Sequence, residues 1–462
     1  MTAPDQVVIV GAGVTGICAG RYLGARGIPY TILEASSDLG GVWRSHRWHG
    51  ARCDSDFIKY SFSFKPDLSA YSHPNSTQIH DYLRSVAVEF GVLPRVRFDT
   101  RVTKAVFDPD EKLWTVHTRR GCYQARFLVN GNGYFAAPHV PQFAGAERFT
   151  GEIFHTIDLD QGRTFTDQDV VLVGSGSTAI CCAPDLARVS KSLVLLQRSP
   201  SYIYEIDDDR VGAATRVCQA LYRLGFRFPV TLLRYALQCR DDFIFVAFRR
   251  FPRFWRWYFK RHWINAVGRT AYERHFRPRY DPWRERPTFA MGLKAQLRSG
   301  RIVIKTGEIA RFTKNAIVLA DGQEIRCDAC VLATGFDVDV LKFDLYVGTR
   351  RVDVGGLNFY KRIMLGSVPN YFHPFGTVHS AWTQSLEPGI RYMVKILAYM
   401  ARHHLRSVAV DRIDVDGAPA ITPNYIMRCL ARLPRAHGTR ELPSIDNLLA
   451  YRFEARDFRF SD

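Results

Sequence analysis

The chain has 462 residues, 47% of them apolar and 23% charged, which suits two or three domains with substantial cores and excludes an intrinsically disordered protein. Basic residues outnumber acidic ones, 63 to 45, for a formal net charge of +18. The first residues lack the basic and long apolar segments of a signal peptide, and no uncharged apolar run is long enough to span a bilayer. We therefore predict an intracellular, cytoplasmic protein, whose ten cysteines are expected to be reduced.

A glycine-rich fingerprint, GAGVTG, stands near the start of the chain. It follows the apolar run of residues 7–10 and precedes a predicted helix over residues 17–25. Gly11 permits the tight turn, Gly13 lets the backbone approach a pyrophosphate, and Gly16 lets helix and strand pack closely. The helix N-terminus then faces the phosphates. The pattern predicts a Rossmann-like dinucleotide site.

A second fingerprint, GSGSTA, repeats this pattern behind an apolar strand over residues 170–173. Its key positions are Gly174, Gly176 and Ala179. Two fingerprints in the context of strand, glycines and helix favour two nucleotide sites over ordinary strand-to-helix packing.

The two fingerprints end in residues of opposite charge. Glu34 follows an apolar strand over residues 30–33, and its carboxylate can bind a ribose diol. At a similar distance after its first glycine, the second unit has Gln197 and then Arg198. A carboxylate would repel a 2′-phosphate, whereas a guanidinium binds it through charge-assisted hydrogen bonds. We therefore predict FAD at the first site and NADPH at the second.

Residues 211–280 do not continue the Rossmann pattern. They hold fifteen basic residues against three acidic ones, and residues 249–263 interleave cations with large aromatic side chains. One interpretation is an inserted helical layer, interrupted at Pro252, whose aromatic side chains pack inward. The other is peripheral contact of residues 249–263 with an anionic membrane surface. Nucleic acid is not a predicted partner, because no recognition motif accompanies the charge.

Cys327 and Cys330 have the spacing of a redox pair. They lie in EIRCDACVLATGF, residues 324–336, which alternates and then becomes apolar like a buried strand. We predict a structural strand here rather than a redox dithiol. No metal site is predicted in the chain.

One stretch after the first fingerprint resembles a known family. Residues 38–64 contain a GGxW turn with Gly41 and Trp43, followed by GARCD and an aromatic-serine stretch. This region resembles the class B flavin-dependent monooxygenases, the group of Baeyer–Villiger and flavin-containing monooxygenases. Within that group, it is most similar to the bacterial Baeyer–Villiger enzymes that include thioamide-prodrug activators.

Three further segments agree with this resemblance. LLQRSP at residues 195–200 matches the family's NADP-selecting strand end, and VLATGF, with Thr334 and Gly335, matches the strand that returns the chain to the flavin domain. FTGEIFHTIDLD resembles the Baeyer–Villiger signature FxGxxxHxxxW(P/D), with Leu159 in place of tryptophan. The resemblance implies that this motif coordinates domain movement and NADPH binding. Its matching residues are Phe149, Gly151, His155 and Asp160.

The resemblance also carries over two catalytic residues. Asp54, in GARCD, matches the family's active-site aspartate, and Arg286, in WRERPT, matches the arginine of its Lys-Arg-Pro motif. The implied chemistry is reduction of the flavin by NADPH, addition of O2 at the flavin C4a carbon, and attack of the peroxide anion on a carbonyl. Arg286 would stabilise that anion, with Asp54 orienting it; the alternative for Arg286 is a structural salt bridge. Glu285 replaces the motif's lysine and would weaken the positive field.

The architecture that follows is an α/β fold with two Rossmann-like domains. We predict an FAD domain formed by residues 1–165 and 326–462, with an inserted NADPH domain of residues 166–325. The inserted domain carries a helical excursion over residues 205–280. The substrate is expected between the domains, near Asp54.

Three functions stay open for this scaffold. The first is NADPH- and O2-dependent Baeyer–Villiger oxidation of a small organic carbonyl substrate. The second is oxygenation of nitrogen or sulfur, and the third is a non-oxygenating NADPH oxidase or redox-responsive flavoprotein. His373, His379 and Trp382 are expected either to line the flavin edge or substrate entrance, or to pack in the core.

Overall fold

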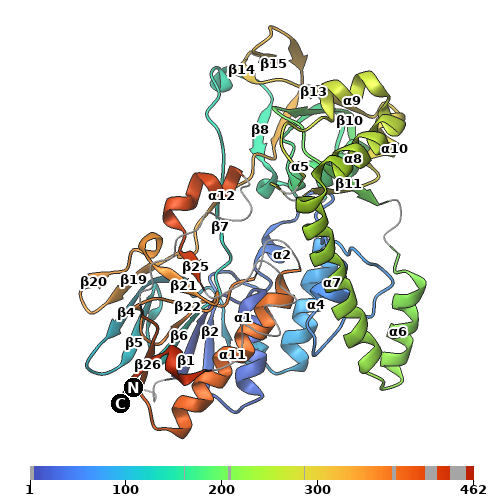
Figure 1. The fold of residues 1–462 in the computed structure, drawn as a ribbon. Coiled ribbons are helices and arrows are strands. Elements are labelled where there is room, and N and C mark those ends of the chain that lie inside the picture. Colours follow the sequence, from blue (N-terminus) through green and yellow to red (C-terminus); the bar gives the residue numbers. More distant parts are fainter. Residues whose placement is uncertain are drawn as a thin grey trace.

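The computed structural model describes residues 5–160, 162–206, 210–282, 284–285, 287–376, 381–411, 424–437 and 454–461. It has two lobes, each built around a β-sheet (Figure 1). The first lobe, at the bottom of Figure 1, holds the first fingerprint and both chain ends, and the second lobe, at the top, holds the second fingerprint. The predicted α/β architecture with two Rossmann-like units is confirmed by these sheets.

The sheet of the first lobe has the strand order β20-β19-β4-β5-β6-β1-β2-β3, with β23 also paired to β6. Strand β1 pairs in parallel with β2 and β6, whereas β5 pairs antiparallel with β4 and β6. The strands are β1 (Asp5–Val10), β2 (Tyr30–Leu33), β3 (Val96–Arg97), β4 (Val102–Asp108), β5 (Leu113–Thr118), β6 (Gly121–Asn130), β19 (Asp344–Val347), β20 (Arg350–Arg351) and β23 (Tyr371–Phe372).

Both faces of β1 are buried, because the sheet lies between two apolar cores. Val7 and Ile9 belong to the core formed with three helices, and Val8 and Val10 belong to the core on the opposite face. Such two-sided burial explains why residues 7–10 of β1 form a continuous apolar run. The predicted strands and helix of this unit form as β1, β2 and α1. The covering helices are α1 (Val14–Gly24), α4 (Ser76–Glu89) and α11 (Trp382–Arg402), and two short helices precede α4, namely α2 (Val42–Ser45) and α3 (Phe57–Tyr60).

The sheet of the second lobe is parallel throughout, in the order β13-β10-β9-β17-β8. Helices α5 (Ser177–Val189) and α10 (Leu293–Arg298) contribute to the core on one face. A three-stranded antiparallel sheet packs on the other through Phe312 and Ile317. The strands of these two sheets are β8 (Glu152–His155), β9 (Phe165–Val173), β10 (Ser190–Gln197), β13 (Ile302–Thr306), β17 (Ala329–Leu332), β14 (Ile309–Phe312), β15 (Ala316–Leu319) and β16 (Glu324–Arg326).

Two extended segments connect the lobes side by side. Strand β7 (Phe135–Pro138) leaves the first lobe and β18 (Phe336–Val338) returns to it, and the two pair antiparallel. Strands β8 and β17 lie just beyond them, and both pair within the second sheet although they precede and follow residues 166–325. The chain therefore passes between the lobes through a paired ribbon.

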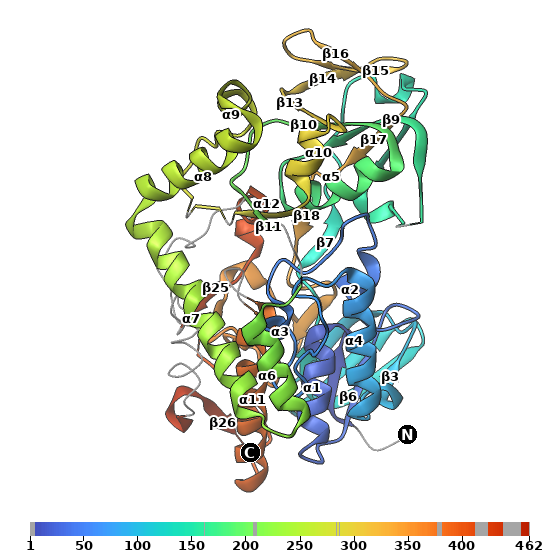
Figure 2. The same ribbon diagram turned by 90° about the vertical axis from the view of Figure 1, so that its right-hand side faces the viewer.

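Residues 211–280 form four helices, which run along the outside of both lobes (Figures 1 and 2). They are α6 (Ala213–Arg223), α7 (Phe228–Arg250), α8 (Pro252–Val267) and α9 (Arg269–His275). The segment is helical, and the backbone breaks at Phe251, directly before Pro252, as predicted. The predicted inward packing of its aromatic side chains is correct only in part, because Phe259 is buried whereas Phe254 and Trp257 are more than half exposed. Trp263 and Phe276 stack at 4.6 Å in the core of the second lobe, so α8 and α9 belong to that lobe. None of the helices within the described residues is both long and apolar enough to cross a bilayer.

Helix α7, in contrast, is fixed to the first lobe by charged side chains. Lys59 of α3, only 1% exposed, forms an ion pair with Asp241. Arg240 contacts Asp56 with 2.6 Å between Nη2 and Oδ2. Burial opposes ionisation of Asp56, but Arg240 and Lys59 outweigh this effect and lower its pKa. These pairs connect the helical excursion to the segment directly after Asp54.

The single strand predicted over residues 324–336 is wrong. This segment forms β16, β17 and β18, which belong to three different sheets. Cys327 and Cys330 are both buried, and burial raises the pKa of the Cys327 thiol to about 12 and that of Cys330 still further. Since thiol exchange needs a thiolate, a redox role is disfavoured. All ten cysteines are free.

The remaining elements are short. They are β11 (Ile203–Ile206), β12 (Thr288–Met291), β21 (Asn358–Tyr360), β22 (Met364–Leu365), β24 (Ser407–Ala409), β25 (Arg435–His437), β26 (Arg459–Ser461), α12 (Asn424–Cys429), and the 3₁₀ helices Leu93–Arg95, Ala146–Arg148, Thr156–Asp158, Val354–Gly356, Leu430–Arg432 and Ala455–Asp457.

Candidate active site

The first fingerprint forms a backbone cradle at the carboxyl end of β1. Gly11 has φ +95°, and its N–H donates to the carbonyl of Leu33 at 2.8 Å. A Cβ on Gly16 would lie 1.9 Å from the Gly11 oxygen, so only glycine fits there. Gly13 precedes α1 without a capping side chain, and a Cβ on it would lie 3.6 Å from the Cα of Gly41. The uncapped N–H groups of α1 and this bare backbone fit a pyrophosphate.

Glu34 is held at the end of β2 by backbone donors. The side chain is 8% exposed, and its two oxygens accept the N–H of Ala12 at 2.7 Å and of Ser36 at 2.8 Å. Each carboxylate oxygen has a further lone pair. A fixed carboxylate at this edge of the sheet fits the hydroxyls of a ribose.

The second fingerprint has a comparable geometry. Gly174 has φ +144°, its N–H donates to the Leu196 carbonyl at 2.8 Å, and a Cβ on it would lie 2.5 Å from the oxygen of Ala333. Ala179 is fully buried against it. Gly176 precedes α5 without a capping side chain and faces open space. Arg198 is exposed directly after β10, where a nucleotide bound at α5 would present its 2′-phosphate.

We expect Arg198→Ala to reduce the preference for NADPH over NADH. Loss of a charge-assisted hydrogen bond to a phosphate is expected to raise the KM for NADPH about tenfold and to leave that for NADH unchanged. Steady-state oxidation of the two nucleotides measures this ratio, with Arg301→Ala, an exposed arginine before β13, as the matched control. An equal change with both nucleotides would contradict the assignment.

The loop carrying Asp54 lies against both lobes. On the side of the first lobe, the indole N–H of Trp43 donates to the hydroxyl of Tyr60 at 2.9 Å. On the other side, a Cβ on Gly50 would lie 2.1 Å from the Cys181 carbonyl of α5. Arg52 extends this contact to α5 and β12. Its guanidinium lies 3.8 Å from the carboxylate of Asp185 and donates to the sulfur of Met291 at 3.2 Å.

Asp54 itself is half-buried within this loop, and the hydroxyl of Ser55 donates to it at 3.4 Å. The GARCD segment is therefore fixed between the two fingerprints. Gly50 and Tyr60 were not predicted as site residues, although Gly50 opens the GARCD motif and needs φ +73°.

The histidine of the predicted domain-motion motif joins the two connecting segments. His155 is 2% exposed; its Nε2 donates to the Gly335 carbonyl at 3.0 Å, and its Nδ1 accepts the N–H of Ile157 at 3.2 Å. Burial lowers its pKa, which suits the neutral ring that this pattern requires. The Gly335 carbonyl also accepts the N–H of His139 at 2.9 Å, and the Thr334 hydroxyl donates to the His139 carbonyl.

The other members of this motif lie along the second lobe. The ring of Phe149 packs edge-on against Phe312 at 5.4 Å, and a Cβ on Gly151 would lie 2.2 Å from the oxygen of Asp328. Asp160 is exposed and accepts the N–H of Gly162 at 2.7 Å. Leu159, at the position of the family's tryptophan, is buried in the core of the second lobe. Of this set, only His155 reaches the returning strand.

A residue that the sequence analysis missed packs against the returning segment. His46 stacks on Phe336 with ring centroids 4.9 Å apart, and is buried beside Trp48. Burial, and then the neighbouring His155, lower its pKa to about 4. In the sequence, His46 is a single histidine after the GGxW turn, and no pattern around it indicates that it contacts Phe336.

Two predicted site residues, Arg286 and His379, lie outside the described residues. Glu285, beside Arg286, has its pKa raised by burial. His373 is 1% exposed, and burial lowers its pKa to about 3, so it is a core residue. Trp382 is half-buried and stacks on Tyr134 at 5.3 Å.

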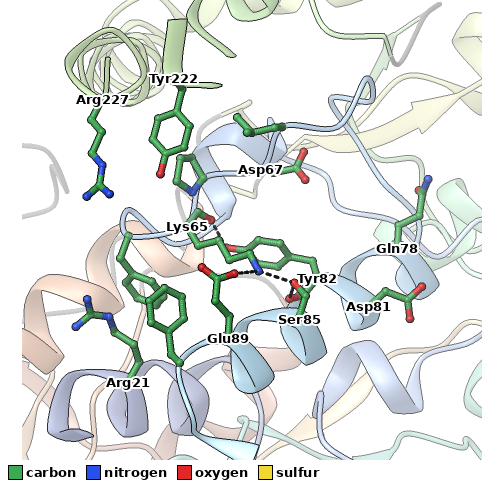
Figure 3. A pocket seen from close by; sticks show the side chains of 14 residues that line it. Arg21, Lys65, Asp67, Gln78, Asp81, Tyr82, Ser85, Glu89, Tyr222 and Arg227 are labelled. Atoms are coloured by element: carbon green, nitrogen blue, oxygen red, sulfur yellow. Dashed lines mark hydrogen bonds and ion pairs between the residues drawn. The ribbon is translucent and has the colours of Figure 1, made fainter. Parts of the chain in front are cut away.

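An open cavity of about 790 Å³ lies elsewhere, between α1, α4 and the α6–α7 turn (Figure 3). Arg21 and Arg227 lie on one side of this cavity. Lys65 lies at its centre and donates hydrogen bonds to Glu89 and Ser85. No fingerprint residue lines it, so this cavity is not the candidate active site.

Comparison with known proteins agrees with this geometry. Residues 4–365 match the family described as flavin-binding monooxygenase-like. The FAD-containing monooxygenase EthA of Mycobacterium tuberculosis is 31% identical, over 95% of this chain and 92% of that protein. The probable FAD-binding monooxygenase AlmA of Acinetobacter baylyi is 26% identical, over 99% and 95%.

Solved structures share the fold. An oxidized steroid monooxygenase bound to NADP matches with a TM-score of 0.79 and 23% identity over 99% of both chains. Cyclohexanone monooxygenase from Rhodococcus sp. Phi1 bound to NADP+ matches with a TM-score of 0.80 and 20% identity over 100% of both. Together with the family match over most of the sequence, these findings confirm the flavoprotein monooxygenase prediction: the chain belongs to the flavin-binding monooxygenase-like family.

Proposed function

We propose that this protein is an FAD-containing, NADPH- and O2-dependent monooxygenase that carries out Baeyer–Villiger oxidation of a small carbonyl compound. FAD is held in the first lobe by Gly11, Gly13, Gly16, Glu34 and the turn with Gly41 and Trp43. NADPH is held in the second lobe by Gly174, Gly176, Ala179 and Arg198. The first lobe would form the FAD domain, and the second lobe, whose sheet includes β8 and β17, the NADPH domain.

One observation carries this proposal: the Asp54 loop is fixed between two nucleotide cradles. Gly50 and Arg52 contact the second lobe, while Trp43 and Tyr60 hold the same segment on the first. A reaction that passes electrons from NADPH to a flavin needs both cofactors to meet at one place. We therefore propose that the reacting parts of the two cofactors meet at the loop that carries Asp54.

The chain's own residues have separate tasks in this scheme. Bound FAD supplies the redox chemistry and the site of oxygen activation. Arg286 contributes a positive charge that is not lost by deprotonation, and Asp54 orients it. His155, bonded to Gly335, links the NADPH lobe to the strand that returns to the flavin. The solved steroid and cyclohexanone monooxygenases of the same fold support the choice of a carbonyl substrate.

Oxygenation of sulfur or nitrogen is the second candidate, and Glu285 is the observation that favours it. Glu285 directly precedes Arg286 in the sequence, at the position where the family has a lysine. An ionised Glu285 weakens the positive field on which an anionic oxidant depends. The raised pKa of Glu285 limits this effect at lower pH, because a protonated carboxyl carries no charge.

A competition experiment separates these functions. We expect the FAD-loaded protein, given NADPH, isotopically labelled dioxygen and equal amounts of a cyclic ketone and a thioether, to form a lactone that contains one labelled oxygen. Mass spectrometry identifies the product. Sulfoxide alone would establish the second candidate, and hydrogen peroxide with neither product would favour a non-oxygenating oxidase.

Asp54→Ala is expected to lower the yield of oxygenated product per NADPH consumed by about tenfold, because the orienting charge beside the reacting groups is lost. Measuring product, NADPH and hydrogen peroxide together gives this ratio. Asp110→Ala, at an exposed aspartate in the turn before β5, serves as the control and should retain the yield. An unchanged ratio in Asp54→Ala would remove this residue from the chemistry.

A further inference from the structure

The outer side of the helical excursion is apolar and exposed. Twelve of the nineteen exposed large apolar side chains in the described part of the chain lie within residues 217–258, on α6, α7, α8 and the turns between them. On α7 they are spaced by three, four or eight residues, which places them on one face of the helix. These α7 residues, with their exposed fractions, are Phe228 (73%), Leu232 (55%), Tyr235 (41%), Phe243 (73%) and Val246 (45%).

Three of the five buried residues of α7 are polar, which is unusual for a surface helix; the other two are a valine and an alanine. Arg234, Gln238 and Asp242 follow at intervals of four residues and are all buried. Arg234 donates to the Ile58 carbonyl and, at 3.3 Å, to the hydroxyl of Ser61. Charged and hydrogen-bonding groups therefore hold α7 on the first lobe, and its apolar residues are left for another partner.

The neighbouring helices extend this surface. Figures 1 and 2 show α6 beside α7 at the outer edge of the molecule, and α8 beyond the end of α7. Helix α6 exposes Val217, and the turn after it exposes Leu224 and Phe226. Helix α8 exposes Phe254 and Trp257. We call this set, from Val217 to Tyr258, the outer apolar face.

The charges around the outer apolar face are almost all positive. The three acidic residues of residues 211–280 are engaged elsewhere: Asp241 with Lys59, Asp242 in a buried contact with Gln238 at 3.3 Å, and Glu273 with Lys260 at 3.1 Å. The exposed cations on these helices include Arg216, Arg223, Arg227, Arg250, Arg253 and Arg261.

We propose that the outer apolar face docks on an anionic phospholipid bilayer. Aromatic and aliphatic side chains would enter the headgroup region, while the surrounding arginines would meet lipid phosphates. A second copy of the chain is disfavoured, because a symmetric contact would bring two positive surfaces together. A polynucleotide is disfavoured, because no nucleic-acid recognition motif accompanies the positive charge.

Flotation with lipid vesicles tests this proposal on the full-length, FAD-loaded protein. We expect it to float with vesicles of phosphatidylcholine mixed with phosphatidylglycerol and to stay unbound with phosphatidylcholine alone. High salt should weaken the binding, because it screens the arginines. Absence of binding to the anionic vesicles at low salt, or equal binding to both kinds, would overturn the proposal.

Two sets of variants separate the apolar and the charged contributions. Leu232→Ser with Phe243→Ser is expected to weaken partitioning roughly tenfold, because two exposed apolar side chains are lost. Arg250→Ala with Arg253→Ala should weaken it roughly fivefold for each cation removed. Val88→Ser, at a similarly exposed valine (57%) on α4, is the matched control and should bind like the wild type.

The same variants also test the competing partner. FAD content and NADPH oxidation should be unchanged in all of them, since none of these residues belongs to the candidate active site. If sedimentation shows a dimer that becomes monomeric in Leu232→Ser with Phe243→Ser, while no variant changes vesicle binding, the face is a self-association surface and the proposal fails. The vesicle result does not depend on whether the oxygenation proposal holds.

Discussion

Gly16→Ala is expected to yield a protein with at least tenfold less bound flavin and a free energy of unfolding lowered by about 3 kcal/mol or more. The reason is steric. The new Cβ would lie 1.9 Å from the carbonyl oxygen of Gly11, and both atoms belong to a turn between β1 and α1 that cannot shift without moving the helix. The flavin absorbance per chain and urea unfolding measure the two effects.

Two other glycines give this experiment its controls. Gly24→Ala, at the end of the same helix, places a Cβ 3.6 Å from the Tyr30 ring and should leave both quantities unchanged. Gly13→Ala places its Cβ 3.6 Å from the Cα of Gly41, an ordinary contact, and should fold but lose flavin, because the methyl group occupies the space of the pyrophosphate. Normal flavin content in Gly16→Ala would show that the turn adapts and that the close approach is unimportant.

Lys59→Met is expected to lower the free energy of unfolding by about 2 kcal/mol, because the carboxylate of Asp241 loses its buried lysine and keeps Arg240, at 2.9 Å, as a partner. The Lys59 side chain is 2% exposed and that of Asp241 is 21% exposed. Oxygenated product per NADPH should also fall, since Lys59 follows Asp54 closely and anchors its segment to α7. Urea unfolding and product analysis on one preparation measure both quantities.

The Lys65–Glu89 pair supplies a matched comparison. Its side chains are 25% and 55% exposed, so Lys65→Met should cost less than about 1 kcal/mol. Replacing both partners of the buried pair, Lys59→Met with Asp241→Leu, should recover most of the lost stability, because no unpaired charge then remains. A loss in the double variant as large as in Lys59→Met would show that packing, rather than the ion pair, is responsible.

The nucleotide cradles were predictable because their signals are local. Gly11, Gly16 and Gly174 follow directly from the strand-to-helix turn, in which a Cβ meets backbone oxygen. Glu34 was predictable by its place at the end of an apolar strand, although its bond to Ala12 was not. The strand boundaries of this unit also follow from apolar runs flanked by turns.

Contacts between distant segments gave no such signal. Nothing near Lys59 in the sequence indicates that Asp241 is its partner, and the contact of Gly50 with α5 joins segments that are about 130 residues apart. The strand predicted over residues 324–336 failed for a related reason. The spacing of apolar residues indicates which of them are buried, but not in which sheet they lie. Three short strands in three different sheets were therefore predicted as one strand.

The break at Phe251 divides the helical excursion into two parts, one ending with α7 and the other beginning with α8. Lys59 and Arg240 hold α7 on the first lobe, while Trp263 packs α8 into the core of the second lobe. A rotation of one lobe relative to the other would therefore have to bend the chain at Phe251, as well as at the β7–β18 ribbon beside Gly335. The helical excursion would then consist of two rigid segments joined at Phe251, and each segment would move with the lobe to which it is attached.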